Sequence, residues 1–223
     1  EAGILYRVDT RLRADGASGP LVRTTQDYLR YLEMRGEAWE RQMLLKARPI
    51  AGDIQTGEAF LKSLERFIFP GVLTRSPNRE IVEIKNRIEA RIVAEGSKKT
   101  HLKLVPGGVR DIEFVTQCLQ LLMGGGRPEV RCSGTLDALD RLREVHAVSD
   151  SEHRILTDAY MFFRSVENVL QWRELLPAFS LPDEPETLAE VEAFLGLESI
   201  GDRPGEALRQ AVETRRLKVR AIY

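Results

Sequence analysis

The chain has 223 residues, of which 43% are hydrophobic and 30% charged, and its 33 basic and 34 acidic residues leave a net charge of −1 at pH 7. This balance and a pI of about 6.4 argue against a general nucleic-acid binder. The longest stretch without a charged residue, Val115 to Gly126, has 12 residues, fewer than the roughly 20 that span a bilayer. We therefore expect neither nucleic acid nor a membrane as partner.

The cysteines and the first 20 residues indicate a cytoplasmic protein. Cys118 and Cys132 have no metal-ligand spacing and are expected to be reduced thiols. Residues 1–20 carry charges throughout, which is not typical of a signal peptide. A chain of this length can bury a substantial core without disulfides or metals.

The first predicted element is a strand over residues 4–13, ILYRVDTRLR. Its side chains alternate, so that Arg7, Asp9, Arg11 and Arg13 share one face. Glycine and proline in the loop 14–20 end this strand, and residues 21–23 are predicted as a short second one. Because an isolated hairpin is marginal in water, residues 1–23 are expected to be the end of an α/β domain.

The remaining residues are predicted to be helical. Thr24 or Thr25 begins a helix towards Arg48, which Gly36 interrupts and Pro49 ends. The other predicted helices cover residues 57–68, 79–95, 108–123, 134–145, 150–176, 185–195 and 204–221. The fold class is therefore mainly α, a helical bundle domain preceded by a truncated α/β remnant of one or two strands.

A candidate site lies on the charged face of the predicted strand. It places one carboxylate, Asp9, among arginines at steps of about 6.6 Å along the strand. Asp9 could hold a divalent metal while Arg11 and Arg13 pair with phosphate oxygens. The alternative is an ion-pair ladder or an ordinary solvated face.

Other groups could extend this candidate anion site. Gly16, Ser18 and Gly19 lie in a loop whose backbone N–H groups an anion can approach closely. Lys46 and Arg48 close a predicted helix, where basic residues either offset the helix dipole or reach a phosphate.

A second constellation is KLVPGGVRDIEF, residues 103–114. Lys103 precedes a Pro-Gly-Gly turn, and Arg110, Asp111 and Glu113 follow in the first turns of a predicted helix. Acidic residues at this place stabilise a helix N-terminus. The rival interpretation makes Asp111 or Glu113 a second carboxylate that faces the strand site, and the spacing does not decide between them.

Three segments in this order resemble the glutamine synthetase adenylyltransferase family: YRVDTRLRADGASGPLV (6–22), WERQMLLKARPIAGD (39–53) and LKLVPGGVRDIEFVTQCLQLL (102–122). The order and spacing match over residues 4–176. The resemblance implies that residues 1–48 are the C-terminal part of a nucleotidyltransferase domain and that residues 49–223 form the helical domain that follows it. Two later segments, AYMFFRSVENVLQ and LPDEPETLAEVEAFLG, are similar to the end of the family's adenylyl-removing half.

The resemblance also implies a chemistry, which is phosphorolysis of an adenylyl-tyrosine on glutamine synthetase with ADP as product. In this family three carboxylates hold two Mg²⁺ ions, and Asp9 matches the third of them. Arg11 and Arg13 would neutralise phosphate charge. The helical wall of the cleft would consist of Lys46, Arg48, Lys103, Arg110, Asp111 and Glu113. The implied ligands and partners are Mg²⁺, ATP or ADP, phosphate, glutamine synthetase and the PII signal protein.

Two alternatives stay open. The first is the reverse reaction, adenylylation from ATP, or uridylylation of a PII protein by a relative. The second is a helical module that docks glutamine synthetase or PII without chemistry, with the acidic stretch 181–202 and the basic stretch 203–220 as the informative surface. Since the other two carboxylates precede the strand in the family, this fragment alone is expected to be inactive.

Overall fold

The computed structural model describes residues 9–70, 101–174, 180–198, 200–201 and 203–222. These residues are mainly helical, which confirms the predicted fold class, and none of them lies in a strand. The structure describes the predicted strand 4–13 only in part and the predicted helix 79–95 not at all. Residues 4–8 and 79–95 lie outside the described ranges, while residues 9–13 form turns and bends instead of the expected strand.

The first helices form one compact group. Its members are α1 (Thr25–Arg35), α2 (Ala38–Leu44), α3 (Ile54–Ser63) and α4 (Glu65–Ile68). Thr24 caps α1 by accepting a hydrogen bond from the Asp27 N–H, and Gly36 ends it, as predicted. The single helix expected over residues 57–68 is two helices, and the first of them begins earlier because Asp53 caps it.

The second group contains the longer helices α6 (Val109–Met123), α7 (Thr135–Glu144), α8 (Asp150–Glu174), α9 (Pro185–Phe194) and α10 (Glu206–Ile222). These agree with the predicted helices to within two residues at nearly every end. Two short 3₁₀ turns, η1 (Gly16–Ser18) and η2 (Pro128–Val130), complete the described elements. None of the described helices is long and apolar enough to cross a membrane.

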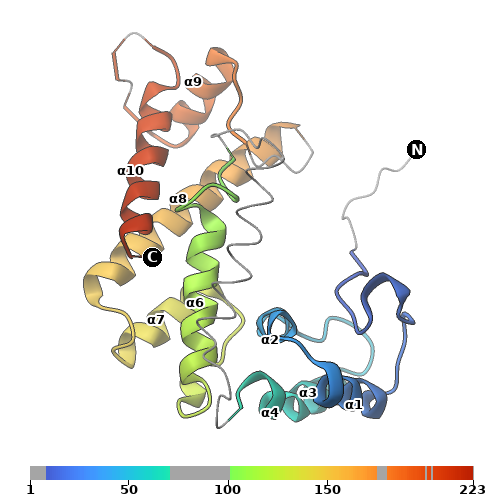
Figure 1. Ribbon diagram of the computed structural model, residues 1–223. Helices are drawn as coiled ribbons and strands as arrows, with labels where there is room; N and C mark the ends of the chain where they lie inside the picture. Colours follow the sequence, from blue (N-terminus) through green and yellow to red (C-terminus); the bar gives the residue numbers. More distant parts are fainter. Residues whose placement is uncertain (1–8, 71–100, 175–179, 199, 202, 223) are drawn as a thin grey trace, which may run out of the picture.

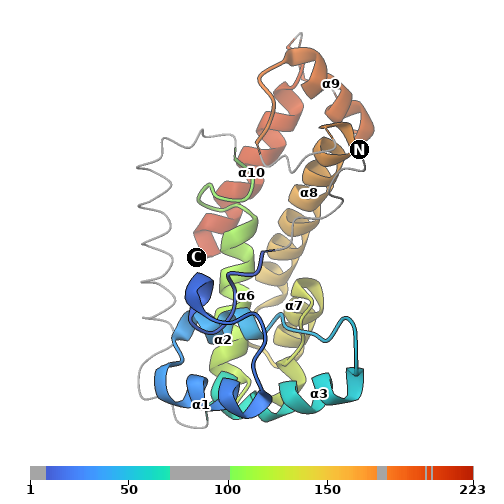
Figure 2. The same ribbon diagram turned by 90° about the vertical axis from the view of Figure 1, so that its right-hand side faces the viewer.

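Two buried cores correspond to these groups, and α6 contributes to both. The larger core includes Ile112 of α6 together with Phe163 of α8 and Leu208 of α10, and the smaller core includes Leu32 of α1 and Leu121 of α6. Figures 1 and 2 show α1–α4 gathered at one end of α6 and α9 near the opposite end of the molecule. The smaller core extends through Phe69, and the predicted domain boundary at residue 48 stays a prediction.

The acidic stretch 181–202 is only partly a solvated face. Glu192 is buried, and its carboxylate accepts hydrogen bonds from the Gly205 N–H at 3.0 Å and the Leu208 N–H at 2.8 Å. These two donors belong to the start of α10, where backbone N–H groups lack helical partners. Glu192 therefore fixes the N-terminus of α10 against α9.

Replacement of Glu192 by alanine should lower the free energy of unfolding by about 2 kcal/mol, because two buried N–H groups lose their acceptor. Urea denaturation followed by circular dichroism measures this change. Glu186→Ala is the control, since Glu186 is exposed on the same helix and its loss should change stability by less than about 0.5 kcal/mol. Equal effects of the two substitutions would contradict the capping role.

Burial of Cys118 in the smaller core makes stability depend on pH in the alkaline range. Burial raises the pKa of this thiol from 9.0 to about 11. Between these values the unfolded chain loses the proton while the folded chain keeps it, so the free energy of unfolding falls as the pH rises from 9 to 11. In the Cys118→Ala variant, the free energy of unfolding, measured by urea denaturation, should fall less steeply between pH 9 and 11. An unchanged slope would contradict the raised pKa of Cys118.

Candidate functional site

Asp9 and Arg11 form a local ion pair at the surface. The Arg11 guanidinium donates from Nε to Asp9 Oδ1 at 2.9 Å and from Nη2 to Oδ2 at 2.6 Å. The Arg11 backbone N–H also donates to Oδ1, at 3.0 Å. The hydrogen bonds to Asp9 raise the pKa of Arg11 above its ordinary value. The expected metal ligand and the expected phosphate ligand are therefore engaged with each other.

Arg13 holds together the loop that follows. Its guanidinium donates to the carbonyl oxygens of Thr10, Ala17 and Gly19, the last from two nitrogens at 3.0 and 2.8 Å. The loop is tight, since a Cβ on Gly19 would lie 2.1 Å from the Ala14 carbonyl oxygen. Arg13 thus satisfies three backbone carbonyl oxygens of this segment.

Asp15 connects this loop to α1. It has a left-handed backbone conformation with φ of 61°, and its carboxylate pairs with Arg23 and, at 3.3 Å, with Arg35. Both guanidiniums also stack over the Tyr31 ring, at 5.8 and 5.1 Å from its centroid. The sequence analysis missed these residues, although the Asp-Gly step at residues 15–16 is a turn signal that allows positive φ.

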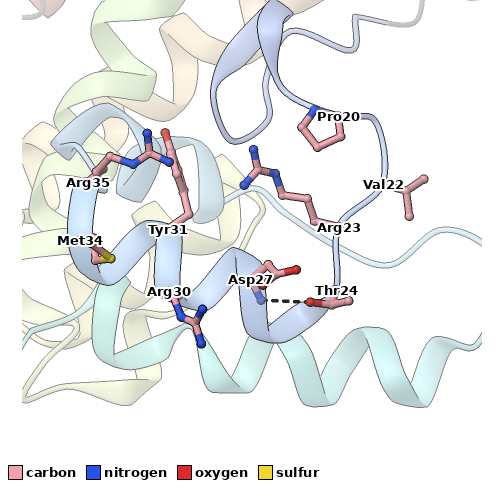
Figure 3. Close-up of a pocket in the computed structure, with 9 residues that line it drawn as sticks. All are labelled: Pro20, Val22, Arg23, Thr24, Asp27, Arg30, Tyr31, Met34 and Arg35. Carbon is pink, nitrogen blue, oxygen red and sulfur yellow. Dashed lines mark hydrogen bonds between the residues drawn. The ribbon is translucent and has the colours of Figure 1, made fainter.

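A cavity of about 690 Å³ opens between this segment and the outer face of α1 (Figure 3). Its lining residues are Pro20, Val22, Arg23, Thr24, Asp27, Arg30, Tyr31, Met34 and Arg35. Figure 3 shows Arg23 and Arg35 close to Tyr31, whereas Arg30 extends away from that pair. Exposed apolar side chains on its rim include Val22 and Met34, which are 85% and 75% exposed. The cavity combines arginine side chains with apolar surface, and Asp15 pairs with two of the three arginines that line it.

Lys46 bridges α2 to the start of α7. Its ammonium donates to the Ser133 carbonyl oxygen at 2.7 Å and to Thr135 Oγ1 at 3.0 Å. Burial lowers the pKa of Lys46, and the nearby carboxylate of Glu113 opposes that shift. Arg48 follows α2 and is exposed. Lys46 therefore holds α2 against the start of α7 by hydrogen bonds, and it lies near the Glu113 carboxylate of α6.

Arg110 and Glu113 lie on the same part of α6. Burial lowers the pKa of Arg110, while the charges of Glu113 and Asp111 oppose that shift. Glu113 accepts a long hydrogen bond from the Tyr160 hydroxyl at 3.5 Å. Glu113 thus lies within electrostatic range of both Lys46 and Arg110, and the helical wall of a cleft stays a prediction. Lys103 is half-buried just before this helix.

Asp111 has a structural role at the Pro-Gly-Gly turn. Its Oδ2 accepts a hydrogen bond from the Gly107 N–H at 2.7 Å, and Arg220 of α10 lies 3.8 Å from the same oxygen. Arg216 of α10 donates to the Pro106 carbonyl oxygen at 3.1 Å. Of the two interpretations of Asp111 left open by the sequence, these contacts support stabilisation of the helix start. We call this set of contacts, made by Pro106, Gly107, Asp111, Arg216 and Arg220, the α10 latch.

The described residues do not form a Mg²⁺ site by themselves. Within them, no three His, Cys, Asp or Glu side chains come together in a way that could hold a metal ion. Both oxygens of Asp9 are bonded to Arg11, and Asp15 is paired with two arginines. Within the described part of the chain, the sequence-predicted site residues fall into two groups, the loop 9–19 and the α2–α6 region.

Comparisons with known proteins show which families share these segments. The model of the GlnD PII-uridylyltransferase family matches residues 82–223, and that of glutamate-ammonia ligase adenylyltransferase matches residues 1–63. A bifunctional glutamine synthetase adenylyltransferase/adenylyl-removing enzyme of Streptomyces avermitilis is 35% identical over 223 residues, which are 99% of this chain and 22% of that protein. The enzyme of the same name from Agrobacterium fabrum is 40% identical over 198 residues, 88% of this chain and 20% of that protein. The chain thus spans about a fifth of the length of these relatives.

The α10 latch predicts that Gly107 cannot carry a side chain. Its φ is +80°, and a Cβ would lie 2.2 Å from the Arg216 carbonyl oxygen. Gly107→Ala should therefore lower the free energy of unfolding by at least about 2 kcal/mol, measured by urea denaturation. Gly126→Ala is the matched control, because a Cβ there meets no atom within 4 Å. If the two variants are equally stable, the close approach of the turn to α10 is wrong.

Proposed function

The chain belongs to the bifunctional glutamine synthetase adenylyltransferase/adenylyl-removing family, and we propose that it works as part of a nucleotidyltransferase that modifies glutamine synthetase. The observation that carries this proposal is the 35% identity to such an enzyme over 223 residues, nearly the whole chain. The names of these relatives state the substrate protein and both directions of the reaction. We place this activity in the cytoplasm.

The proposed direction is removal of the adenylyl group by phosphate, with ADP as the product. Its support is the similarity of residues 159–171 and of the segment that begins at Leu181 to the end of the family's adenylyl-removing half. A second candidate is action on, or binding to, a PII protein, since the uridylyltransferase family model matches residues 82–223. These two candidates involve different partners and are therefore separable by experiment.

The residues of this chain would contribute charge stabilisation to such a transfer. The reaction displaces an oxygen at a phosphorus atom surrounded by negative charge, so positioned cations lower its barrier. Arg11 is exposed and able to turn from Asp9 to a phosphate, whereas Arg13 keeps the loop 9–19 in shape. Lys46, Arg110 and Glu113 would line the helical side, with Arg48 and Lys103 near them.

Mg²⁺ would supply Lewis-acid stabilisation of the phosphoryl oxygens, and we propose Asp9 as one of its ligands. Its exposed carboxylate is an oxygen donor of the kind that Mg²⁺ prefers. Gly16, Ser18 and Gly19 would present the loop backbone to the nucleotide. The Ser18 hydroxyl donates to the Asp15 carbonyl oxygen at 2.8 Å, which keeps this loop ordered.

A chimeric enzyme tests the proposal. The matching segment of the Streptomyces avermitilis enzyme is replaced by this chain, and phosphate-dependent release of ADP from adenylylated glutamine synthetase is measured with Mg²⁺. Asp9→Asn should lower this rate by more than about tenfold, and Asp27→Asn in the first turn of α1 is the control. A loss of ATP-dependent adenylylation alone would assign the chain to the opposite direction. An Asp9→Asn chimera as active as its parent in both directions would exclude the metal-ligand role.

A further inference from the structure

A second, smaller cavity lies inside the group formed by α1–α4. It has a volume of about 340 Å³, and its lining residues are Leu29, Leu32, Glu33, Gly36, Arg41, Ser63, Arg66 and Phe67. The lining thus contains two arginines and one carboxylate, so that its net charge is positive. Arg30 and the two arginines beside Tyr31 belong to a different cavity.

The two arginines of this cavity lack a counter-ion within the described part of the chain. Neither the Arg41 nor the Arg66 side chain forms an ion pair or a hydrogen bond with a described residue. Arg41 Nε is moreover buried without an acceptor among the residues that the structure describes. The first cavity differs, because Arg23 and Arg35 there both pair with Asp15. An N–H group without an acceptor is costly where it is buried, as at Arg41 Nε, and an anion in this cavity would remove that cost.

Packing holds the cavity in shape. The Arg41 guanidinium stacks over the Phe67 ring at 5.1 Å from its centroid. The same ring fits against Gly36, where a Cβ would lie 2.4 Å from Phe67 Cε2. Gly36 therefore permits the position of Phe67, and Phe67 in turn fixes Arg41. A charged group that is held before a ligand arrives loses little conformational entropy on binding.

We propose that this cavity binds a small organic oxyanion whose carboxylate or phosphate group pairs with Arg41 and Arg66. Arginine suits both kinds of head group, because its planar fork presents parallel donors. Leu29 and Leu32 supply an apolar wall for the body of the ligand. The volume is at the lower end of the range for small-molecule sites, roughly 300–1,000 Å³. This site is independent of the transfer reaction proposed above.

Titration calorimetry of the 223-residue chain with phenyl phosphate and with benzoate tests the proposal at constant ionic strength. At least one probe should bind saturably, and the tighter one identifies the head group. Arg66→Gln should weaken binding by about tenfold, the loss of one charge-assisted hydrogen bond. Arg66 is exposed, so this variant should fold, and thermal unfolding checks that it does. Arg66→Lys should recover only part of the affinity, because lysine lacks the fork.

Arg30→Gln is the matched control, since it removes an exposed arginine of α1 that lines the other cavity. The proposal predicts unchanged affinity in this variant. Equal weakening by Arg30→Gln and Arg66→Gln would show a general charge effect and overturn the site. Wild-type affinity in folded Arg66→Gln, or the absence of saturable binding of both probes, would overturn it as well.

Discussion

The burial of α6 between two cores is the constraint on which the arrangement of the described residues depends. Ile112 packs in the larger core and Leu121 in the smaller one. Between them a buried hydrogen bond of 2.6 Å joins Gln42 of α2 to Gln117 of α6. Because a buried polar pair is costly to separate, this contact sets the register of α2 on α6. The relative placement of Lys46 and the polar residues of α6 follows from it.

The arginines of this chain differ in whether their guanidinium already has a partner within the described fold. Arg13 is used for the fold of its loop, and Arg23 shares Asp15 with Arg35. Arg66 has no such partner among the described residues. The contacts of Arg13, Arg23 and Arg35 stabilise the local fold, whereas Arg66 keeps its donors available for a ligand. This difference separates the two cavities, although both look basic in composition.

The helices could be predicted because their signals are local. Thr24 and Gly36 act within one turn of the helix they bound, and apolar periodicity marks the buried faces. The strand expected over residues 4–13 depended on a partner strand, and in its described part, residues 9–13, alternation alone supplies no ladder hydrogen bonds. Asp111 and Glu192 could not be assigned from the sequence. Glu192 accepts from backbone N–H groups at the start of α10, whereas Asp111 accepts from the Gly107 N–H and lies near Arg220 of α10. Burial decides whether such a carboxylate meets water or backbone N–H groups.

The α10 latch has a mechanical consequence. The Pro-Gly-Gly turn lies directly against the α10 backbone, since a methyl group on Gly107 would meet the Arg216 carbonyl, and it leads without a break into α6. A displacement of α10 along its axis would therefore push the first turn of α6, which carries Arg110. A movement of α10 would in this way be transmitted to the start of α6, which is about 100 residues earlier in the sequence but adjacent in space.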